Sequence, residues 1–453
     1  MGFSPMHDSL IVYTFAIFAL TTLCILWRPQ GINEAIPAIS GAILLFIAGI
    51  VPLHDIVYIF KLVSGPSITI ISTIVMCIVL ESIGVFRWAA LNVVKRAKGS
   101  GIRLFWSIML LCFLMTVFFN NDGSILITTP IILHIVQIIR IKPQQKLPYL
   151  FAGVFIATSA SLPIGVSNIA NLIGLQMVGL NLVSYTNLAF VPSMIGIATL
   201  SLLLYLLFRN EIPRKIPDIQ DSISDPTFKN HPLSGVQKTV ESMNWPLFRM
   251  CFFLVVLIRG SYFILPAYGF SIEWIAITGA LLLIGIRWVS LKVSPIDILW
   301  KAPWHILVFA FGMYVTVYAL KNTGVTSYMM SILDGVMTQS LMSASFASGI
   351  LISVLSNLMN NLPSVMLGTL LITEIGLDTQ TLQVAYISMI IGSDIGALLT
   401  PLGTLATLLW MFVLKKNGVP ITWSAYFRVA LMVIPITLLV TLIALNIWLW
   451  LIL

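Results

Sequence analysis

Two pairs of helix-breaking motifs divide this 453-residue chain into similar halves. The motifs are Asn120-Asn121-Asp122-Gly123, Pro163-Ile164-Gly165, Asn360-Asn361-Leu362-Pro363 and Pro401-Leu402-Gly403. The two asparagine motifs are separated by nearly the same length of chain as the two proline motifs. All four lie in long apolar stretches, where breaking a lipid-facing helix leaves backbone groups unpaired. Paired breaks at corresponding positions of two halves indicate the substrate site of a membrane transporter.

The composition predicts a protein that crosses a membrane many times. Hydrophobic residues make up 59% of the chain and charged residues 9%, against about 25% charged residues in ordinary soluble domains. Residues 10–27 are apolar but no small-residue cleavage site follows, so we interpret them as a first span and not as a signal peptide. The net charge of +8 reflects short basic loops between spans, and it does not indicate a nucleic-acid partner.

Basic residues predict the course of the chain at the first asparagine motif. The segments 87–103 and 140–148 hold five and three Lys or Arg residues, so both are expected in the cytoplasm. The 36 residues between them, 104–139, would reach about 54 Å as one helix, against roughly 30 Å of hydrocarbon. Because both ends lie on the same side, 104–139 is predicted to be a re-entrant helical hairpin with Asn121-Asp122 at its tip.

The second half is predicted to have the opposite orientation. No Lys or Arg occurs between Lys321 and Lys415, and loops without basic residues are expected outside. A second hairpin at 342–376 should therefore enter from the outer face. Discontinuous spans are expected after the hairpins, at 149–180 and 382–414.

The predicted fold is an all-α polytopic membrane protein with ten crossings and two hairpins, built from two inverted-topology repeats. The repeats cover 1–208 and 247–453, and a cytoplasmic linker covers 209–246. The eight unbroken spans are expected at 10–27, 36–53, 67–86, 188–208, 247–266, 271–287, 304–320 and 429–450. This arrangement places 21 of 24 Lys and Arg residues in the cytoplasm and both termini outside.

Two carboxylates are candidates for carrying a coupled proton. Asp122 and Asp394 are the acidic residues deepest in the predicted membrane, where an ionised carboxylate is costly and usually marks an ion or proton pathway. At a hairpin tip the helix N-terminus stabilises the Asp122 anion, whereas burial disfavours it. The competing interpretation for both residues is a structural carboxylate that caps exposed amides.

Amide and hydroxyl side chains around the breaks are candidates for binding a small, uncharged, polyhydroxylated solute. They offer both donors and acceptors, as do the backbone groups freed at the breaks. The candidate substrate-binding residues are Asn120, Asn121, Asn168, Asn171, Asn360, Asn361, Thr400 and Thr404. The helix-breaking residues are Gly123, Pro163, Gly165, Pro363, Pro401 and Gly403. The alternative is that the amides only cap half-helices, and the two roles can coexist.

Missing residue types narrow the chemistry. We expect no Lys or Arg near either tip or either break, which argues against an anionic substrate, although helix N-termini alone can hold an anion. Arg259, within a span, is expected to form an ion pair or to snorkel. The chain has no GxxxxGK[ST] motif with which to use ATP by itself, and no metal-ligand or Ser-His-Asp spacing. The four cysteines sit singly in apolar runs, typical of packing residues, and a thiol site for a soft substrate is the alternative.

An ordered set of short stretches carries a family resemblance. The stretches are Phe119–Gly123 with Thr129-Pro130, Ser161–Pro163 with Ser167-Asn168, Ala302–His305 with Phe311–Tyr314, Asn360–Ser364, and Gly392–Gly396 with Thr400–Trp410. On this set the chain resembles the ArsB-type arsenite efflux permeases of the ion transporter superfamily over nearly its whole length. One departure is Asn120, where we expect Ala in many relatives.

The resemblance implies a multi-pass cell-membrane transporter, not an enzyme, that needs no cofactor. Such permeases export arsenite and antimonite from the cytoplasm, use the proton-motive force, and in some members couple to a soluble ATPase subunit. Their substrates at neutral pH are mainly uncharged trihydroxy species, which suits a site of Asn, Thr and Asp. Two alternatives stay open: a sodium/proton antiporter or anion symporter of the same superfamily, and a membrane scaffold or enzyme, against which the paired breaks argue.

Overall fold

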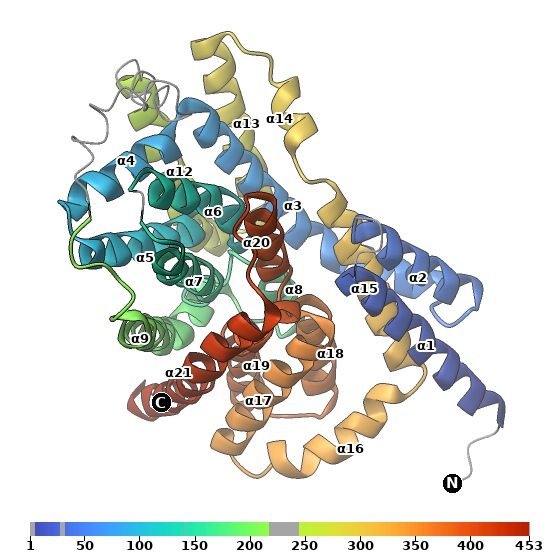
Figure 1. Cartoon of the computed structure of the whole chain (residues 1–453). Helices are drawn as coiled ribbons and strands as arrows, with labels where there is room; N and C mark the ends of the chain where they lie inside the picture. Colours follow the sequence, from blue (N-terminus) through green and yellow to red (C-terminus); the bar gives the residue numbers. More distant parts are fainter. Residues whose placement is uncertain (1–4, 28–31, 140, 217–243, 453) are drawn as a thin grey trace.

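The computed structural model describes residues 5–27, 32–139, 141–216 and 244–452, and every regular element in these ranges is helical. The helices of the first half are α1 (Pro5–Trp27), α2 (Ala35–Ile47), α3 (Leu53–Ile83), α4 (Val85–Ala97), α5 (Gly101–Phe118), α6 (Asn121–Ile138), α7 (Pro143–Ser159), α8 (Ile169–Met177) and α9 (Leu182–Phe208). Most of the predicted linker, 209–246, lies outside the described residues. Figure 1 follows the chain in colour from its N-terminus to its C-terminus.

The second half contains helices of both the α and the 3-10 type. They are α12 (Trp245–Ile264), η3 (Leu265–Tyr268), α13 (Ile272–Leu291), α14 (Ile296–Lys301), α15 (His305–Asn322), α16 (Val325–Met337), α17 (Leu341–Met359), α18 (Asn361–Glu374), α19 (Thr379–Asp394), η4 (Gly396–Leu399), η5 (Pro401–Gly403), α20 (Leu405–Lys416) and α21 (Trp423–Ile452). The two short 3-10 helices η4 and η5 fill the predicted break at Pro401.

Ten helical segments in the described ranges are long and apolar enough to cross a membrane. They are Ser9–Trp27, Leu53–Ile83, Gly101–Phe118, Leu182–Phe208, Trp245–Tyr268, Ile272–Leu291, Ile296–Asn322, Leu341–Met359, Thr379–Leu399 and Trp423–Ile452. The prediction of an all-α polytopic protein with about ten spans is therefore confirmed. The membership of the set differs. The helices α5 and α17, predicted as hairpin arms, are long enough to count, whereas α2, with 13 residues, and the two pieces of the predicted span 149–180, α7 with 17 residues and α8 with 9, are not.

The structure differs from the expected spans around Pro66. We expected a connection between the spans 36–53 and 67–86, but α3 is one continuous helix of 31 residues with Pro66 inside it. Neighbouring helices often stabilise a proline inside a membrane helix, and α3 packs against α13 and α15. Two further helices, α4 and α16, lie directly before the predicted hairpins, where we predicted no helix.

The two halves follow the same order of elements around their asparagine motifs. The helices α4 and α16, α5 and α17, and α6 and α18 form corresponding pairs, and the starts of each pair are offset by the same length of chain as the asparagine motifs themselves. The helices also break where the sequence predicts, between α5 and α6 and between α17 and α18. The re-entrant course of these hairpins and the opposite orientation of the halves in a membrane stay predictions.

The broken helices of the two halves interlock at the centre of the molecule. Helix α6 of the first half packs against α20 of the second, and α8 of the first half packs against α18 of the second (Figure 1). Each of these four helices begins directly after a break in the chain. Their N-termini, which carry unpaired N–H groups, are therefore brought to one place from both halves.

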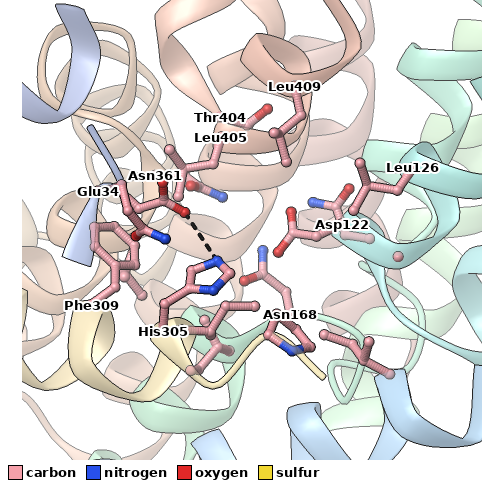
Figure 2. Close-up of a pocket in the computed structure, with 18 of the residues that line it drawn as sticks. Glu34, Asp122, Leu126, Asn168, His305, Phe309, Asn361, Thr404, Leu405 and Leu409 are labelled. Carbon is pink, nitrogen blue, oxygen red and sulfur yellow. Dashed lines mark ion pairs between the residues drawn. The ribbon is translucent and has the colours of Figure 1, made fainter. Parts of the chain in front are cut away.

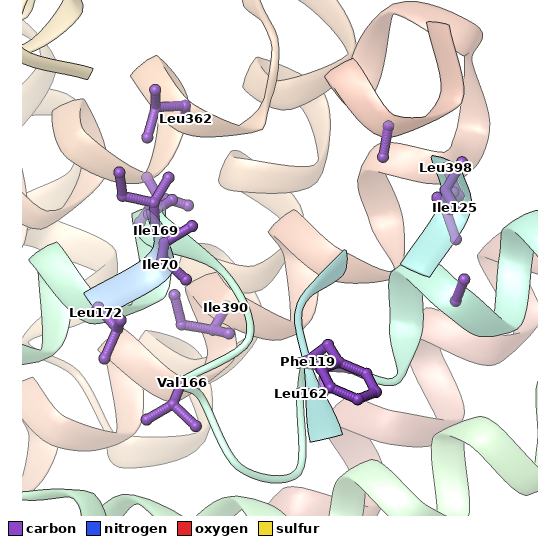
Figure 3. Packing of buried hydrophobic residues seen from close by; sticks show 14 of the residues in the cluster. Ile70, Phe119, Ile125, Leu162, Val166, Ile169, Leu172, Leu362, Ile390 and Leu398 are labelled. Carbon is purple, nitrogen blue, oxygen red and sulfur yellow. The ribbon is translucent and has the colours of Figure 1, made fainter. Parts of the chain in front are cut away.

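Apolar packing closes one side of this centre. Helix α18 is buried from Asn361 to Ile372, and α8 is buried from Ile169 to Leu175. Figure 3 shows Ile169 and Leu172 of α8 close to Ile70 of α3, and α8 contacts both α3 and α18. The space that remains at the N-termini lies on the other side, toward α6 and α20.

Candidate functional site

A cavity of about 370 Å³ lies where the four N-termini meet. The residues that line it are Ile32, Asn33, Glu34, Ile74, Asn121, Asp122, Gly123, Leu126, Asn168, Ile169, Pro303, His305, Ile306, Phe309, Asn361, Leu362, Thr404, Leu405 and Leu409. Figure 2 shows polar side chains from both halves of the chain pointing into the same space. No Lys, Arg or Cys is among the described lining residues.

The structure brings part of the predicted site together. Six predicted residues line the cavity: Asn121, Asp122, Gly123, Asn168, Asn361 and Thr404. The other predicted residues are not among the lining residues: Asn120, Asn171, Asn360, Thr400, Asp394, Pro163, Gly165, Pro363, Pro401 and Gly403. Only part of the predicted set therefore contacts the cavity.

Each of the four helices is capped by a side chain at its first turn. Asn120 Oδ1 accepts from Gly123 N at 3.2 Å, and Asn168 Oδ1 accepts from Ala170 N at 3.1 Å. In the second half, Asn360 Oδ1 accepts from Leu362 N at 3.4 Å and Thr404 Oγ1 from Thr407 N at 3.1 Å. The capping role foreseen for these amides is thus present. Each cap pairs with one N–H group that has no partner within the helix. The other N–H groups of the first turn lie at the end of the helix that is nearest the cavity.

The first tip presents an amide and a carboxylate to the cavity. Asn121 N donates to Ser167 O at 3.0 Å, which ties the tip to the break between α7 and α8. The Asn121 side chain is 4% exposed, and its Oδ1 accepts no hydrogen bond from any described residue. Asp122 stands beside it in the first turn of α6. The tip therefore offers acceptor oxygens next to a helix N-terminus.

Arg259 corrects our expectation that no cation lies near a tip. Its Nε donates to Phe118 O at 2.6 Å, and its Nη2 donates to Phe119 O. These carbonyls end α5, where the helix has no partner of its own for them. Neither ion pairing nor snorkelling describes this contact: Arg259, buried in α12, supports the first tip from behind. The expectation failed because α12 belongs to the other half of the chain, far from the tip in sequence.

The second tip is held by contacts within its own half. Asn360 Nδ2 donates to Leu402 O at 3.2 Å, across to the break before α20. Ser364 Oγ donates to Asn360 O at 2.6 Å. Pro363 is in the first turn of α18, where the N–H that proline lacks has no intrahelical partner. Asn361 reaches the cavity from this tip, as Asn121 does from the first.

The first break depends on a glycine in left-handed geometry. Gly165 has φ of +72°, and a Cβ built on it would lie 2.8 Å from the ring of Tyr185. Tyr185 OH donates to Leu162 O at 2.7 Å, which fixes the loop that contains Pro163. A side chain at position 165 would be strained and would also clash. This loop carries Asn168 to the cavity.

The second break is organised by Asn357, which sequence analysis missed. Asn357 Oδ1 accepts from Thr400 N at 2.7 Å, and its Nδ2 donates to Gly396 O at 2.8 Å. A Cβ built on Gly403 would collide with the backbone oxygen of Ala397, so only glycine fits there. Asn357 lies on α17, one turn before the predicted motif at Asn360. Its amide stands in for helical hydrogen bonds that the break removes.

Asp394 binds the two discontinuous spans together. Its carboxylate accepts from Ser161 Oγ at 2.6 Å, Asn168 Nδ2 at 3.1 Å and Asn171 Nδ2 at 2.9 Å. Asp394 is fully buried and does not line the cavity. It does, however, accept a hydrogen bond from Asn168, which lines the cavity. The carboxylate at the end of α19 thereby fixes the α7–α8 break of the other half.

Two titratable lining residues were not among the predicted site residues. Glu34 precedes α2, and His305 begins α15. Glu34 Oε1 and His305 Nε2 are 3.6 Å apart, and Figure 2 shows the pair across the cavity from Asp122. His305 ends the Ala-Pro-Trp-His stretch that carries part of the family resemblance, and this was the available signal. For Glu34 the sequence offered none, because its loop lies far from every break.

The cavity presents hydrogen-bond donors and acceptors from two sides. Helix N-termini supply N–H donors and a positive field, and the side chains of Asp122 and Glu34 supply acceptors. Within the described part of the chain, no three His, Cys, Asp or Glu side chains converge in a way that could hold a metal ion. The lining side chains can form hydrogen bonds, and their carboxyl and imidazole groups can also exchange protons.

Comparisons with known proteins cover nearly the whole chain. A sequence model described as arsenical pump membrane protein matches residues 12–449. A protein of Bacillus subtilis (strain 168) named "Putative arsenical pump membrane protein" is 46% identical over 439 residues, which are 96% of this chain and 99% of that protein. An arsenical pump membrane protein of Escherichia coli is 33% identical over 430 residues, 95% of this chain and 97% of its own length.

Proposed function

The chain belongs to the arsenical pump membrane protein family, and we propose that it exports arsenite and antimonite from the cytoplasm in exchange for protons. The cargo binds in the cavity between α6, α8, α18 and α20. Neutral trihydroxy species present three hydroxyl groups, each able to donate and to accept hydrogen bonds. The convergence of four helix N-termini with acceptor oxygens is the observation that carries this proposal.

The cavity supports an inward-facing state of an alternating-access cycle. In the predicted topology, α6 and α20 run from the midplane to the cytoplasm, and the cavity extends along them to Leu126 and Leu409. The helices α8 and α18, which run to the outer face, are buried at their N-terminal turns. Cargo would enter from the cytoplasm and leave after the outer helices separate. Two inverted repeats, each with a re-entrant hairpin, would give the two closing movements.

Proton coupling is assigned to Asp122 and supported by Asp394. Export of a neutral solute against a gradient needs a driving ion, and one proton moving inward gains about 2.3 kcal/mol per 100 mV. Asp122 reaches the cavity where cargo would bind. Asp394 accepts a hydrogen bond from Asn168 of the same cavity, so a change at the site would be transmitted through this contact to the other half of the chain.

Uptake into everted membrane vesicles tests this function. Vesicles that contain the protein should accumulate labelled arsenite and antimonite when a proton gradient is imposed, and should stop when an uncoupler removes it. Vesicles without the protein are the control. A third set with ATP but no proton gradient asks whether a separate ATPase subunit drives transport. Failure of the gradient to support any uptake by the wild type would reject proton antiport.

A dicarboxylate or other anion symporter is the second candidate. Four helix N-termini converge on the cavity, and Arg259 stands behind one tip, so the positive field is larger than the sequence indicated. Competition in the same vesicles separates the two functions. Succinate and sodium should leave arsenite uptake unchanged if the cargo is a neutral metalloid. Succinate-dependent loss of arsenite uptake would favour the anion symporter.

A further inference from the structure

His305 and Glu34 place a titratable pair in the wall of the cavity. The two residues come from different halves of the chain, yet their Nε2 and Oε1 atoms are 3.6 Å apart. Imidazole is the side chain whose charge ordinarily changes between pH 5 and 8. A pair of this kind, facing a carboxylate across a cavity, has the chemistry to pass protons.

The three titratable side chains in the wall of the cavity are all partly exposed. The side chain of His305 is 40% exposed and that of Glu34 is 12% exposed, and Asp122 at the first tip is partly buried. In the predicted topology the loops before α2 and α15 are cytoplasmic, so His305 lies between cytoplasmic water and the tip. A proton released from the tip to the cytoplasm would pass this pair.

Among the described residues that line the cavity, few other charges face the pair. Ile74 comes from α3, Asn361 from α18 and Leu405 from α20, all uncharged, and α6 contributes Asp122. Lys301, four residues before His305 at the end of α14, is exposed. The described lining residues with titratable side chains are therefore Asp122, Glu34 and His305.

We propose that His305 is a second proton-carrying residue of the transport cycle and that Glu34 positions it over the cavity. This inference rests on the proposed antiport. The Asp122 carboxylic acid loses its proton and becomes a carboxylate. The His305 imidazole gains that proton through water and becomes an imidazolium, which then releases a proton to the cytoplasm. The cavity is large enough for several water molecules, each of which takes about 30 Å³.

The test separates coupling from cargo binding in everted vesicles. His305→Gln keeps a hydrogen-bonding side chain but cannot carry a proton. Gradient-driven arsenite accumulation should fall about tenfold, whereas counterflow exchange of labelled for unlabelled arsenite without a gradient should stay within about twofold of the wild type. Glu34→Gln should keep both activities in part and shift the pH at which driven uptake is half-maximal.

A matched control is available at His54. His54 Nε2 pairs with Asp55 Oδ1 at 2.9 Å, its side chain is 81% exposed, and it is not among the lining residues. His54→Gln removes a histidine–carboxylate pair of the same chemistry away from the cavity. Driven uptake and its pH profile should both match the wild type.

Two further measurements keep the inference open to rejection. If His305→Gln does not reach the membrane, arsenite-dependent proton release by detergent-solubilised wild type and Glu34→Gln replaces the vesicle assay. Glu34→Gln should then shift the pH dependence of that release, and an unchanged pH dependence overturns the inference. Equal driven uptake by His305→Gln and wild type overturns it too, as does parallel loss of driven uptake and exchange. Absence of uptake by the wild type rejects the antiport itself and is seen before any variant is compared.

Discussion

The two hairpin tips share a local sequence but are stabilised differently. At the first tip Asn120 has an extended backbone, with φ of −158°, and carbonyls of the tip accept hydrogen bonds from Arg259 in the other half. At the second tip Asn360 has φ of +81° and ψ of 154°, and its side chain binds Leu402 in its own half. The first tip carries Asp122, where the second carries Leu362. A duplicated motif has thus acquired different charge and different supports.

The difference shows that two tips with a similar sequence can be stabilised in different ways. Hydrogen bonds from a charged donor contribute about 1.5–3 kcal/mol each, so Arg259 can stabilise the first tip and leave its side chains free for the proposed binding of proton and cargo. The second tip stores backbone strain of about 1–3 kcal/mol and is tied to its own break. We infer that the first tip carries the proton and binds the cargo, and that the second tip mainly shapes the cavity.

The largest expected effect is at Asp122. Asp122→Asn should reduce gradient-driven arsenite accumulation to the level of empty vesicles, because the second tip has no carboxylate to replace it. Counterflow exchange should persist, since Asn keeps the shape and much of the hydrogen bonding. Asp334→Asn on the exposed face of α16 is the control. If Asp122→Asn still accumulates arsenite when a proton gradient is imposed, Asp122 is not required for coupling, and the two tips do not differ in this role.

The same vesicle assay of Asp394→Asn tests whether the second buried carboxylate is structural or takes part in coupling. Asp394 accepts three hydrogen bonds from Ser161, Asn168 and Asn171, and an Asn side chain must turn its NH₂ group toward one of these donors. We expect driven transport and exchange to fall together, with a lower melting temperature. Loss of driven transport alone would assign Asp394 a coupling role of its own.

The next largest effect is at Arg259. Arg259→Met should leave the carbonyls of Phe118 and Phe119 without their donor and lower the stability of the protein by about 3 kcal/mol. The measurement is the melting temperature in detergent, together with the amount of protein in the membrane. Arg249→Met removes an exposed arginine of the same helix and should change neither. If Arg259→Met is as stable as the wild type, the first tip does not depend on hydrogen bonds from Arg259.

Asn121→Ala and Asn361→Ala compare the tips directly as cargo ligands. Both residues line the cavity, but only the Asn121 Oδ1 is buried without a described partner. We expect Asn121→Ala to raise the arsenite concentration for half-maximal exchange about tenfold, equivalent to about 1.4 kcal/mol, and Asn361→Ala to raise it about threefold. Equal effects would place the cargo midway between the tips, and no effect in either would exclude this cavity.

Local rules predicted the breaks, and long-range packing decided the rest. Asn120, Asn168, Asn360 and Thr404 follow the preference of Asn and Thr for helix N-caps, so the start of each half-helix was readable from the sequence. Arg259 reaches its partners from the opposite half of the chain, and Glu34 and His305 meet across the two halves in the same way. No periodicity or motif encodes such contacts, because they exist only after helices from both halves have packed.

Pro66 shows the same limit in the fold. Proline inside a helix costs about 3 kcal/mol in isolation, and Pro66 lies in the connection that we expected between the spans 36–53 and 67–86. In the folded protein α3 packs against α13 and α15 and runs through the proline. Tertiary packing overrode a local preference there, whereas at Pro163 and Pro401 glycines that admit no side chain keep the helices broken.

The smallest effect tests the strain at the second tip. Asn360→Gly relieves a backbone geometry that L residues rarely adopt, but it loses the cap to Leu362 N and the bond to Leu402 O. The two effects nearly cancel, so the melting temperature should stay the same or rise slightly. Asn120→Gly has no strain to relieve, because extended backbone suits any residue, and it loses the cap to Gly123 N. Its stability should fall by about 1 kcal/mol.

The sign of the difference between these two glycine variants is the measurement that matters. Thermal unfolding of both proteins in the same detergent should place Asn360→Gly above Asn120→Gly. If both variants melt equally below the wild type, the φ of +81° at Asn360 stores no free energy, and the tips differ only in Asp122 and Arg259. If Asn360→Gly is stabilised but loses exchange, the strained backbone serves transport, because relief of the strain would favour one state of the cycle over the other.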